Sequence, residues 1–212
     1  KVRQQRMKER LTHQMKIQVK IEKKLLLLKK MKHSNIIFLI LTVMSVSVSC
    51  VKQKLETIYN SQESRIDKYI EKNRISGTDT LRVVYNGGTS RLVIKEGAGE
   101  ELSQDGTIAF YYAGYIFNSS ISNADLFTTN HRQSATEAGW DLSDEDAKVL
   151  TVNLQDYELI PGLKNGLTGV KGGEECQILF SGKYGFGKKQ FGIVPANSAL
   201  VYKIWVESIS ND

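Results

Sequence analysis

Four short motifs follow one another in a fixed order near the C-terminus, and they constrain the fold more than any other feature of the sequence. Proline is tolerated in the first turn of a helix, and glycine ends helices and permits tight turns. One short helix is therefore expected from Pro161 to about Leu167, closed by Gly169, Gly172 and Gly173. In order, the motifs are Leu159-Ile160-Pro161-Gly162-Leu163, Gly172-Gly173-Glu174, Tyr184-Gly185-Phe186-Gly187 and Ile193-Val194-Pro195-Ala196-Asn197-Ser198-Ala199-Leu200-Val201-Tyr202.

Alternating apolar residues on both sides of that helix predict a sheet. Strands are expected over residues 81–85 and 91–95, joined by a turn at 86–88, and over residues 107–117, 149–154, 174–181 and 200–209. The last strand places Leu200, Tyr202, Ile204 and Val206 on one face, and Cys176 is expected as a buried core thiol. Antiparallel strands around one short helix give an α+β fold, and about 130 residues can bury a single core.

Residues 51–73 carry an apolar residue every three or four positions, which predicts an amphipathic helix about 35 Å long. The helix either docks on the following domain, acts as a simple tether or pairs with another copy, and the first two are favoured. The apolar positions are Leu55, Ile58, Tyr59, Ile66, Tyr69 and Ile70.

Residues 31–49 have a basic start, a short apolar run and small residues before Cys50, and this pattern resembles a bacterial lipoprotein signal. The resemblance implies a lipid on Cys50 and a location in the bacterial cell envelope. Ser47 departs from the usual aliphatic residue. The apolar run would reach only about 20 Å as a helix, too short to span a hydrocarbon core of about 30 Å. Residues 50–78 would then be a tether, and no acidic cluster follows Cys50, which favours the periplasmic side.

Residues 1–30 are expected to be a basic extension upstream of the true start, although they also suit a basic beginning of the signal itself. Residues 1–35 hold twelve of the 29 Lys and Arg but only two of the 23 acids, so the rest of the chain is mildly acidic despite a net charge of +6. A basic average would indicate nucleic-acid binding, but the folded part gives no such indication.

Taken together, the four motifs and the strands before them resemble FKBP-type peptidyl-prolyl cis-trans isomerases over roughly residues 79–209. The resemblance implies an FKBP-like antiparallel half-barrel sheet wrapped on one short helix, in a domain of residues 79–212. Residues 130–148 form a polar insertion that contains Trp140. This insertion either shapes specificity beside the site or is a surface excursion that Trp140 holds down.

The resemblance also assigns an apolar pocket to particular residues. Aromatic residues on strands are otherwise most often core residues, so each of these positions has a structural alternative. The catalytic positions are Tyr112, Phe127, Leu159, Ile160, Leu163, Phe186 and Tyr202, and the substrate-binding positions are Thr128, Leu150, Ile193 and Val194.

Three of these residues depart from the family pattern. Thr128 replaces the usual Asp, Phe186 the usual Tyr, and Leu150 a common Phe. Loss of the phenolic hydroxyl at position 186 removes a hydrogen bond worth about 0.5–1.5 kcal/mol, or up to about tenfold in affinity. Activity is therefore expected to be reduced rather than abolished.

Prolyl isomerisation requires no cofactor and no metal, because the barrier is set by amide resonance. Only His131 remains after residue 50, and no Cys or His set suits zinc. The expected function is isomerisation of proline-containing, unfolded or nascent exported polypeptides. The alternatives are a catalytically weak FKBP-like binding or chaperone lipoprotein and a purely structural lipoprotein.

Overall fold

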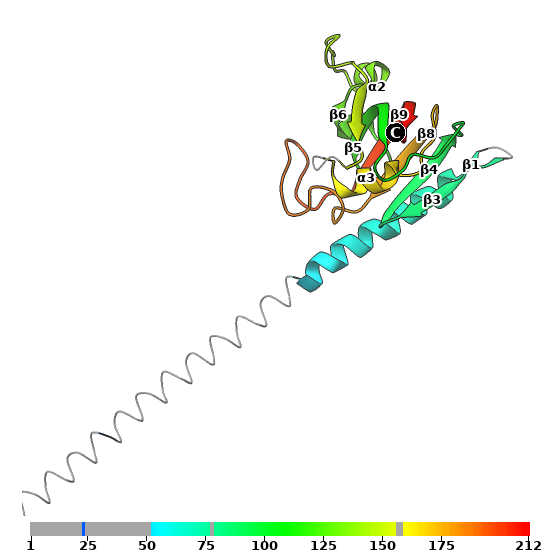
Figure 1. The fold of residues 1–212 in the computed structure, drawn as a ribbon. Helices are drawn as coiled ribbons and strands as arrows, with labels where there is room; N and C mark the ends of the chain where they lie inside the picture. The colour runs from blue at the N-terminus through cyan, green and yellow to red at the C-terminus, as the bar shows by residue number, and fades with distance from the viewer. Residues whose placement is uncertain (1–22, 24–51, 77–78, 156–158) are drawn as a thin grey trace, which may run out of the picture. The chain divides into compact units, whose positions relative to one another are not determined.

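The computed structural model describes residue 23 and residues 52–76, 79–155 and 159–212 (Figure 1). The predicted signal, Cys50 and the predicted basic extension apart from Lys23 lie outside these residues. The chain divides into two units, Lys1–Leu55 and Glu56–Asp212, and the second contains the sheet. Within the described ranges, no helix combines the length and the apolar character needed to cross a bilayer.

The main sheet has the strand order β3-β4-β8-β9-β5-β6, with β7 also paired to β5, and all its neighbours are antiparallel. Each predicted strand forms within about two residues of its expected bounds. β1, β2 and β6 were not predicted. The strands are β1 (Ile75–Ser76), β2 (Asp79–Thr80), β3 (Val83–Asn86), β4 (Thr89–Lys95), β5 (Thr107–Ile116), β6 (Leu126–Thr129), β7 (Leu150–Asn153), β8 (Glu175–Phe180) and β9 (Leu200–Ser210).

Alternate residues of β9 face opposite sides of the sheet, as the period of two in a strand requires. One side carries the core that the short helix covers, and Val201 contributes to a second core on the other side. The prediction of a shared face is confirmed for Leu200, Tyr202, Ile204 and Val206.

Cys176 is a free, buried thiol in the first core, as predicted. Burial raises the pKa of this thiol well above its ordinary value, so it stays protonated and is a poor nucleophile.

The short helix α3 (Pro161–Leu167) has the predicted bounds and lies against the sheet (Figure 1). Its glycines permit this close approach. A Cβ on Gly162 would lie 2.3 Å from the ring of Phe180, and one on Gly166 would lie 2.2 Å from Ile178 Cγ2. The sequence Pro-Gly-Leu-Lys-Asn-Gly-Leu therefore gives a helix with a bare face that packs directly on β8.

Residues 52–73 form the predicted N-terminal helix. Ile66 and Ile70 are buried in the second core, together with Tyr115 and Phe117, whereas Ile58 is exposed. The helix therefore docks on the domain from about Tyr59 to Ile70, and docking is one of the arrangements that the sequence left open.

A buried ion pair lies beside the C-terminal end of α3. Arg91 Nε lies 3.2 Å from Glu174 Oε1, and the two side chains are 3% and 0% exposed. Arg91 also donates to three backbone carbonyls at the end of α3, those of Gly166, Thr168 and Gly169. Arg91 thus donates hydrogen bonds to backbone carbonyls that the end of the helix leaves without partners.

The insertion begins with Asn130 and contains the short helix α2 (Arg132–Glu137). Asn130 is 4% exposed, and the ring of His131 stacks on Trp205 with a centroid separation of 3.8 Å. Trp140 is 39% exposed. Asn130 and His131 therefore hold the start of the segment to the sheet, and a role of the partly exposed Trp140 in holding it stays a prediction. The 3-10 helix η1 (Asn123–Asp125) precedes β6.

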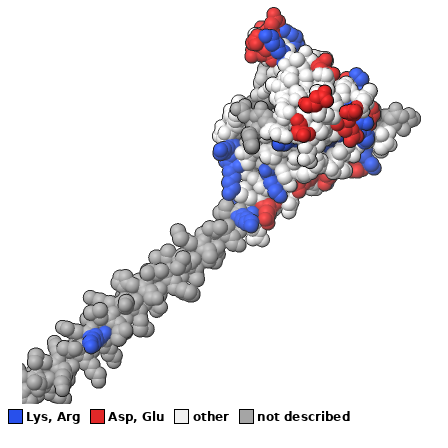
Figure 2. All heavy atoms as spheres, in the orientation of Figure 1, with Lys and Arg blue, Asp and Glu red and all other residues white. Residues whose placement is uncertain are grey.

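Acidic and basic side chains are interspersed over the part of the second unit that Figure 2 shows, and neither sign forms a continuous face there. This distribution fits the mildly acidic composition of the chain after residue 35.

Candidate functional site

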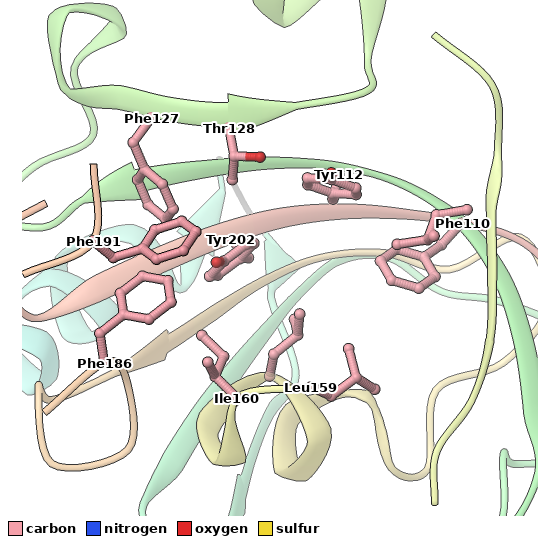
Figure 3. Close-up of a pocket in the computed structure, with 11 residues that line it drawn as sticks. Phe110, Tyr112, Phe127, Thr128, Leu159, Ile160, Phe186, Phe191 and Tyr202 are labelled. Carbon is pink, nitrogen blue, oxygen red and sulfur yellow. The ribbon is translucent and has the colours of Figure 1, made fainter. Parts of the chain in front are cut away.

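An apolar cavity of about 220 Å³ opens between the start of α3, the strands β5, β6 and β9, and the loop before β9 (Figure 3). Leu159 and Ile160 line one side because Ile160, the N-cap residue of α3, has an extended backbone. Aromatic rings line the other side. The lining residues are Phe110, Tyr112, Phe127, Thr128, Leu150, Leu159, Ile160, Leu163, Phe186, Phe191 and Tyr202.

All residues assigned from the sequence line this cavity except two. Ile193 is 63% exposed, and Val194 is 1% exposed within the first core. The cause is a tight turn in which Phe191 and Val194 exchange backbone hydrogen bonds of 3.0 and 2.8 Å, with Gly192 at φ +53°. This turn directs Phe191 to the cavity, so Phe191 occupies the wall position predicted for Ile193 and Val194.

The aromatic rings contact one another in a continuous series (Figure 3). Phe191 stacks on Phe186 with a centroid separation of 4.5 Å and an interplanar angle of 14°. Phe186 meets Phe127 edge-on at 6.1 Å, and Phe127 meets Tyr202 edge-on at 5.8 Å. These pairs line one wall of the cavity with the faces and edges of aromatic rings, which suits a flat apolar group.

Three hydroxyl groups line the cavity without a hydrogen-bond partner in the described part of the chain: those of Tyr112, Thr128 and Tyr202. Tyr202 is 5% exposed, and burial raises its pKa well above 10, so its phenol keeps its proton at neutral pH. An unpaired phenol in an apolar cavity is a ready donor to a ligand carbonyl. Tyr202 therefore offers the type of donor that Phe186 lacks.

Asn130, which the sequence did not single out, fixes the strand that carries Tyr112. Its Oδ1 accepts from the backbone N–H of Tyr112 at 2.6 Å, and its Nδ2 donates to the carbonyl of Lys148 at 2.9 Å. Thr129 Oγ1 donates to the carbonyl of Tyr112 at 2.7 Å. The start and the end of the insertion are thus both tied to the strand beside the cavity.

Comparison with known proteins gives the family of this domain. The profile of a family described as FKBP-type peptidyl-prolyl cis-trans isomerase matches residues 98–207, more than half of the chain. The chain belongs to this family. The matched range contains every residue that lines the cavity. The FKBP-type fold predicted from the sequence is therefore confirmed, and the enzyme class is peptidyl-prolyl cis-trans isomerase.

Similar FKBP-type proteins differ in how much of their length the chain covers. FK506-binding protein 1 of Aspergillus oryzae is 26% identical over 117 residues, which are 55% of this chain and 94% of that protein. The FKBP-type peptidyl-prolyl cis-trans isomerase FkpA of Buchnera aphidicola is 24% identical over 174 residues, 77% of this chain and 61% of that protein. The crystal structure of FkpA from Escherichia coli aligns with a TM-score of 0.49 and 21% identity, over 76% of this chain and 65% of that chain.

Replacing Tyr202 with Phe in this FKBP-type domain tests the donor role of its hydroxyl. We expect kcat/KM on a proline peptide to fall by up to about tenfold, since one neutral hydrogen bond contributes about 0.5–1.5 kcal/mol. Protein stability should not fall, because the hydroxyl has no partner in the described structure. The matched control is Tyr111→Phe on the other face of β5, and an equal loss in both variants would argue against the donor role.

Proposed function

We propose that this isomerase acts on proline-containing segments of unfolded or nascent exported polypeptides, from a lipid anchor on Cys50 that faces the periplasm. The apolar cavity, lined by three hydroxyls that have no hydrogen-bond partner among the described residues, is the observation that supports catalysis on a prolyl peptide. The lipoprotein-like pattern of residues 31–50 supports the anchor and the envelope location.

Rotation about a prolyl peptide bond must overcome a barrier of about 18–20 kcal/mol that arises from amide resonance. Water strengthens this resonance by hydrogen bonding to the amide oxygen. The rings of Phe127, Phe186 and Tyr202 are placed to enclose a proline ring and exclude water, with Leu159 and Ile160 on the opposite side of the cavity. A hydroxyl donor placed for the carbonyl of the twisted amide then stabilises the transition state more than the ground state.

The catalytic rate is expected to vary little between about pH 6 and pH 8, because the described residues that line the cavity include no Asp, Glu, His, Lys, Arg or Cys. Tyr202 lines the cavity, and burial raises the pKa of its phenol further above 10. Burial lowers the pKa of His131 from its ordinary value, and its ring stacks on Trp205 and does not line the cavity. A bell-shaped profile of kcat/KM would contradict this non-covalent mechanism.

The anchor is tested in the intact chain by a Cys50→Ala variant with Cys176 unchanged. We expect incorporation of labelled fatty acid into the parent and none into the variant, and loss of the variant from the membrane fraction. Equal labelling and equal fractionation of both would refute the anchor and leave the isomerase activity untouched.

The client class is tested by the refolding of an exported protein that has a slow proline-limited phase, with and without the chain. Acceleration of that phase supports the proposal. Suppression of aggregation without acceleration supports the second candidate, a catalytically weak binding module. Thr128 and Phe186 in the cavity, and the exposed Phe191 and Ile193 beside it, favour that candidate.

A further inference from the structure

The loop between β8 and β9, residues 181–199, carries two of the aromatic residues that form the cavity. Phe186 and Phe191 both lie on this loop and stack on each other (Figure 3). The loop has turns but no helix and no named strand. Loops of this length adopt several conformations unless contacts fix them, so the shape of the cavity depends on how this loop is held.

Gln62 of the N-terminal helix binds both ends of the loop. Its Oε1 accepts from the backbone N–H of Gly182 at 2.9 Å, and its Nε2 donates to the carbonyl of Asn197 at 2.6 Å. The side chain is only 6% exposed. A buried amide that uses both its acceptor and its donor in this way is a specific connection and not a solvated surface contact.

Neighbouring side chains of the same helical turn reinforce this connection. Tyr59 donates to Asn197 Oδ1 at 2.7 Å, and Glu63 Oε1 accepts from Ser181 Oγ at 3.1 Å. The loop ends are pressed together, since a Cβ on Gly182 would lie 2.3 Å from the carbonyl oxygen of Asn197. Asn197 has φ +60°, which few residues other than glycine adopt.

We propose that Gln62 is a positioning residue of the isomerase, which holds Phe186 and Phe191 at the cavity by joining Gly182 to Asn197. The N-terminal helix is on this account a part of the catalytic unit. The C-terminal part of the helix provides a control for the contacts of Gln62. There Tyr69 donates to Gln177 Oε1 at 2.9 Å in the middle of β8 and not to the loop.

The test compares Gln62→Leu with Tyr69→Phe in the full chain. Each variant removes hydrogen bonding of the N-terminal helix, but Gln62→Leu removes bonds to the loop, whereas Tyr69→Phe removes a bond to β8. We expect Gln62→Leu to lower kcat/KM on a proline peptide by about tenfold or more, because small displacements of binding groups strongly reduce catalysis, and Tyr69→Phe to change it by less than about twofold. The NMR ring signals of Phe186 and Phe191 should shift in the first variant only.

The pH dependence of activity in a Gln62→Glu variant distinguishes positioning of the loop from a purely structural role of Gln62. An ionised carboxylate still accepts from Gly182 but has no hydrogen to donate to Asn197, whereas the protonated acid regains a donor. The activity of this variant should therefore rise relative to the parent as pH falls through the pKa of the new carboxyl group, which burial raises.

Equal losses of kcat/KM in Gln62→Leu and Tyr69→Phe would overturn the proposal and reduce Gln62 to a general docking contact. Unchanged activity in Gln62→Leu would overturn it as well. If Gln62→Leu does not fold, Gln62→Glu alone tests the proposal. A ratio of Gln62→Glu activity to parent activity that does not change with pH would contradict the connection between Gln62 and the loop.

Discussion

Replacement of Arg91 with Leu is expected to lower the free energy of unfolding by about 3–5 kcal/mol, because the buried charge of Glu174 then keeps only the longer, 3.5 Å contact with the partly exposed Arg82. Glu174 is 0% exposed, and Arg91 Nε lies 3.2 Å away, close enough for an ion pair although the angle is not that of a hydrogen bond. The same change also leaves the carbonyls of Gly166, Thr168 and Gly169 without their donor.

Urea denaturation of the parent and the variant measures this loss. Arg82→Leu is the control, because Arg82 is 38% exposed and pairs with the exposed Glu96 at 2.7 Å and only at 3.5 Å with Glu174, so its loss should cost less than that of Arg91. Burial raises the pKa of Glu174 above its ordinary value. The deficit of Arg91→Leu should therefore shrink as pH falls and this carboxyl group takes up a proton. Equal losses in both variants would contradict the account of the buried pair.

Replacement of Tyr112 with Ala is expected to lower kcat/KM by about a hundredfold, because it opens the cavity to water and removes both a ring and a hydroxyl from the site. Tyr112 lies between Phe110 and Tyr202, with ring centroids 6.0 and 6.4 Å away. Its backbone is held by Asn130, so the strand itself should persist in the variant.

The neighbouring Tyr111 is the control for this prediction. Tyr111 lies on the opposite face of β5, where its ring is 6.4 Å from that of His131, and it does not line the cavity. Tyr111→Ala should keep kcat/KM within about threefold of the parent even if it loses a similar free energy of unfolding. A comparable loss of activity in both variants would mean that activity falls because the protein is less stable, and not because the cavity is altered.

The sequence predicted the parts of this fold that depend on local signals. Pro161 and the glycines around it define α3 to the residue, and the alternation along β5, β8 and β9 defines the central strands. β6 and α2 were missed because they are short and depend on pairing and packing with distant residues. Their four and six residues carry too little pattern to be recognised alone.

Most of the site followed from the family motifs, but its details depend on tertiary structure. Phe191 was missed in favour of Ile193 and Val194, because the turn around Gly192 decides which side chain points to the cavity. Gln62 was missed because its partners lie 120 and 135 residues away, and a polar residue on a helix looks like a surface residue in the sequence. The lipid on Cys50 stays a prediction.

The most direct test of the central claim is prolyl cis–trans exchange in a short Ala-Leu-Pro-Phe peptide, measured by NMR with the parent chain and with a Tyr112→Ala, Phe127→Ala variant. The account predicts acceleration by the parent that disappears in the variant, with both proteins giving folded spectra. A folded parent that does not accelerate exchange, or a variant that accelerates it equally, would contradict the assignment of catalysis to this cavity.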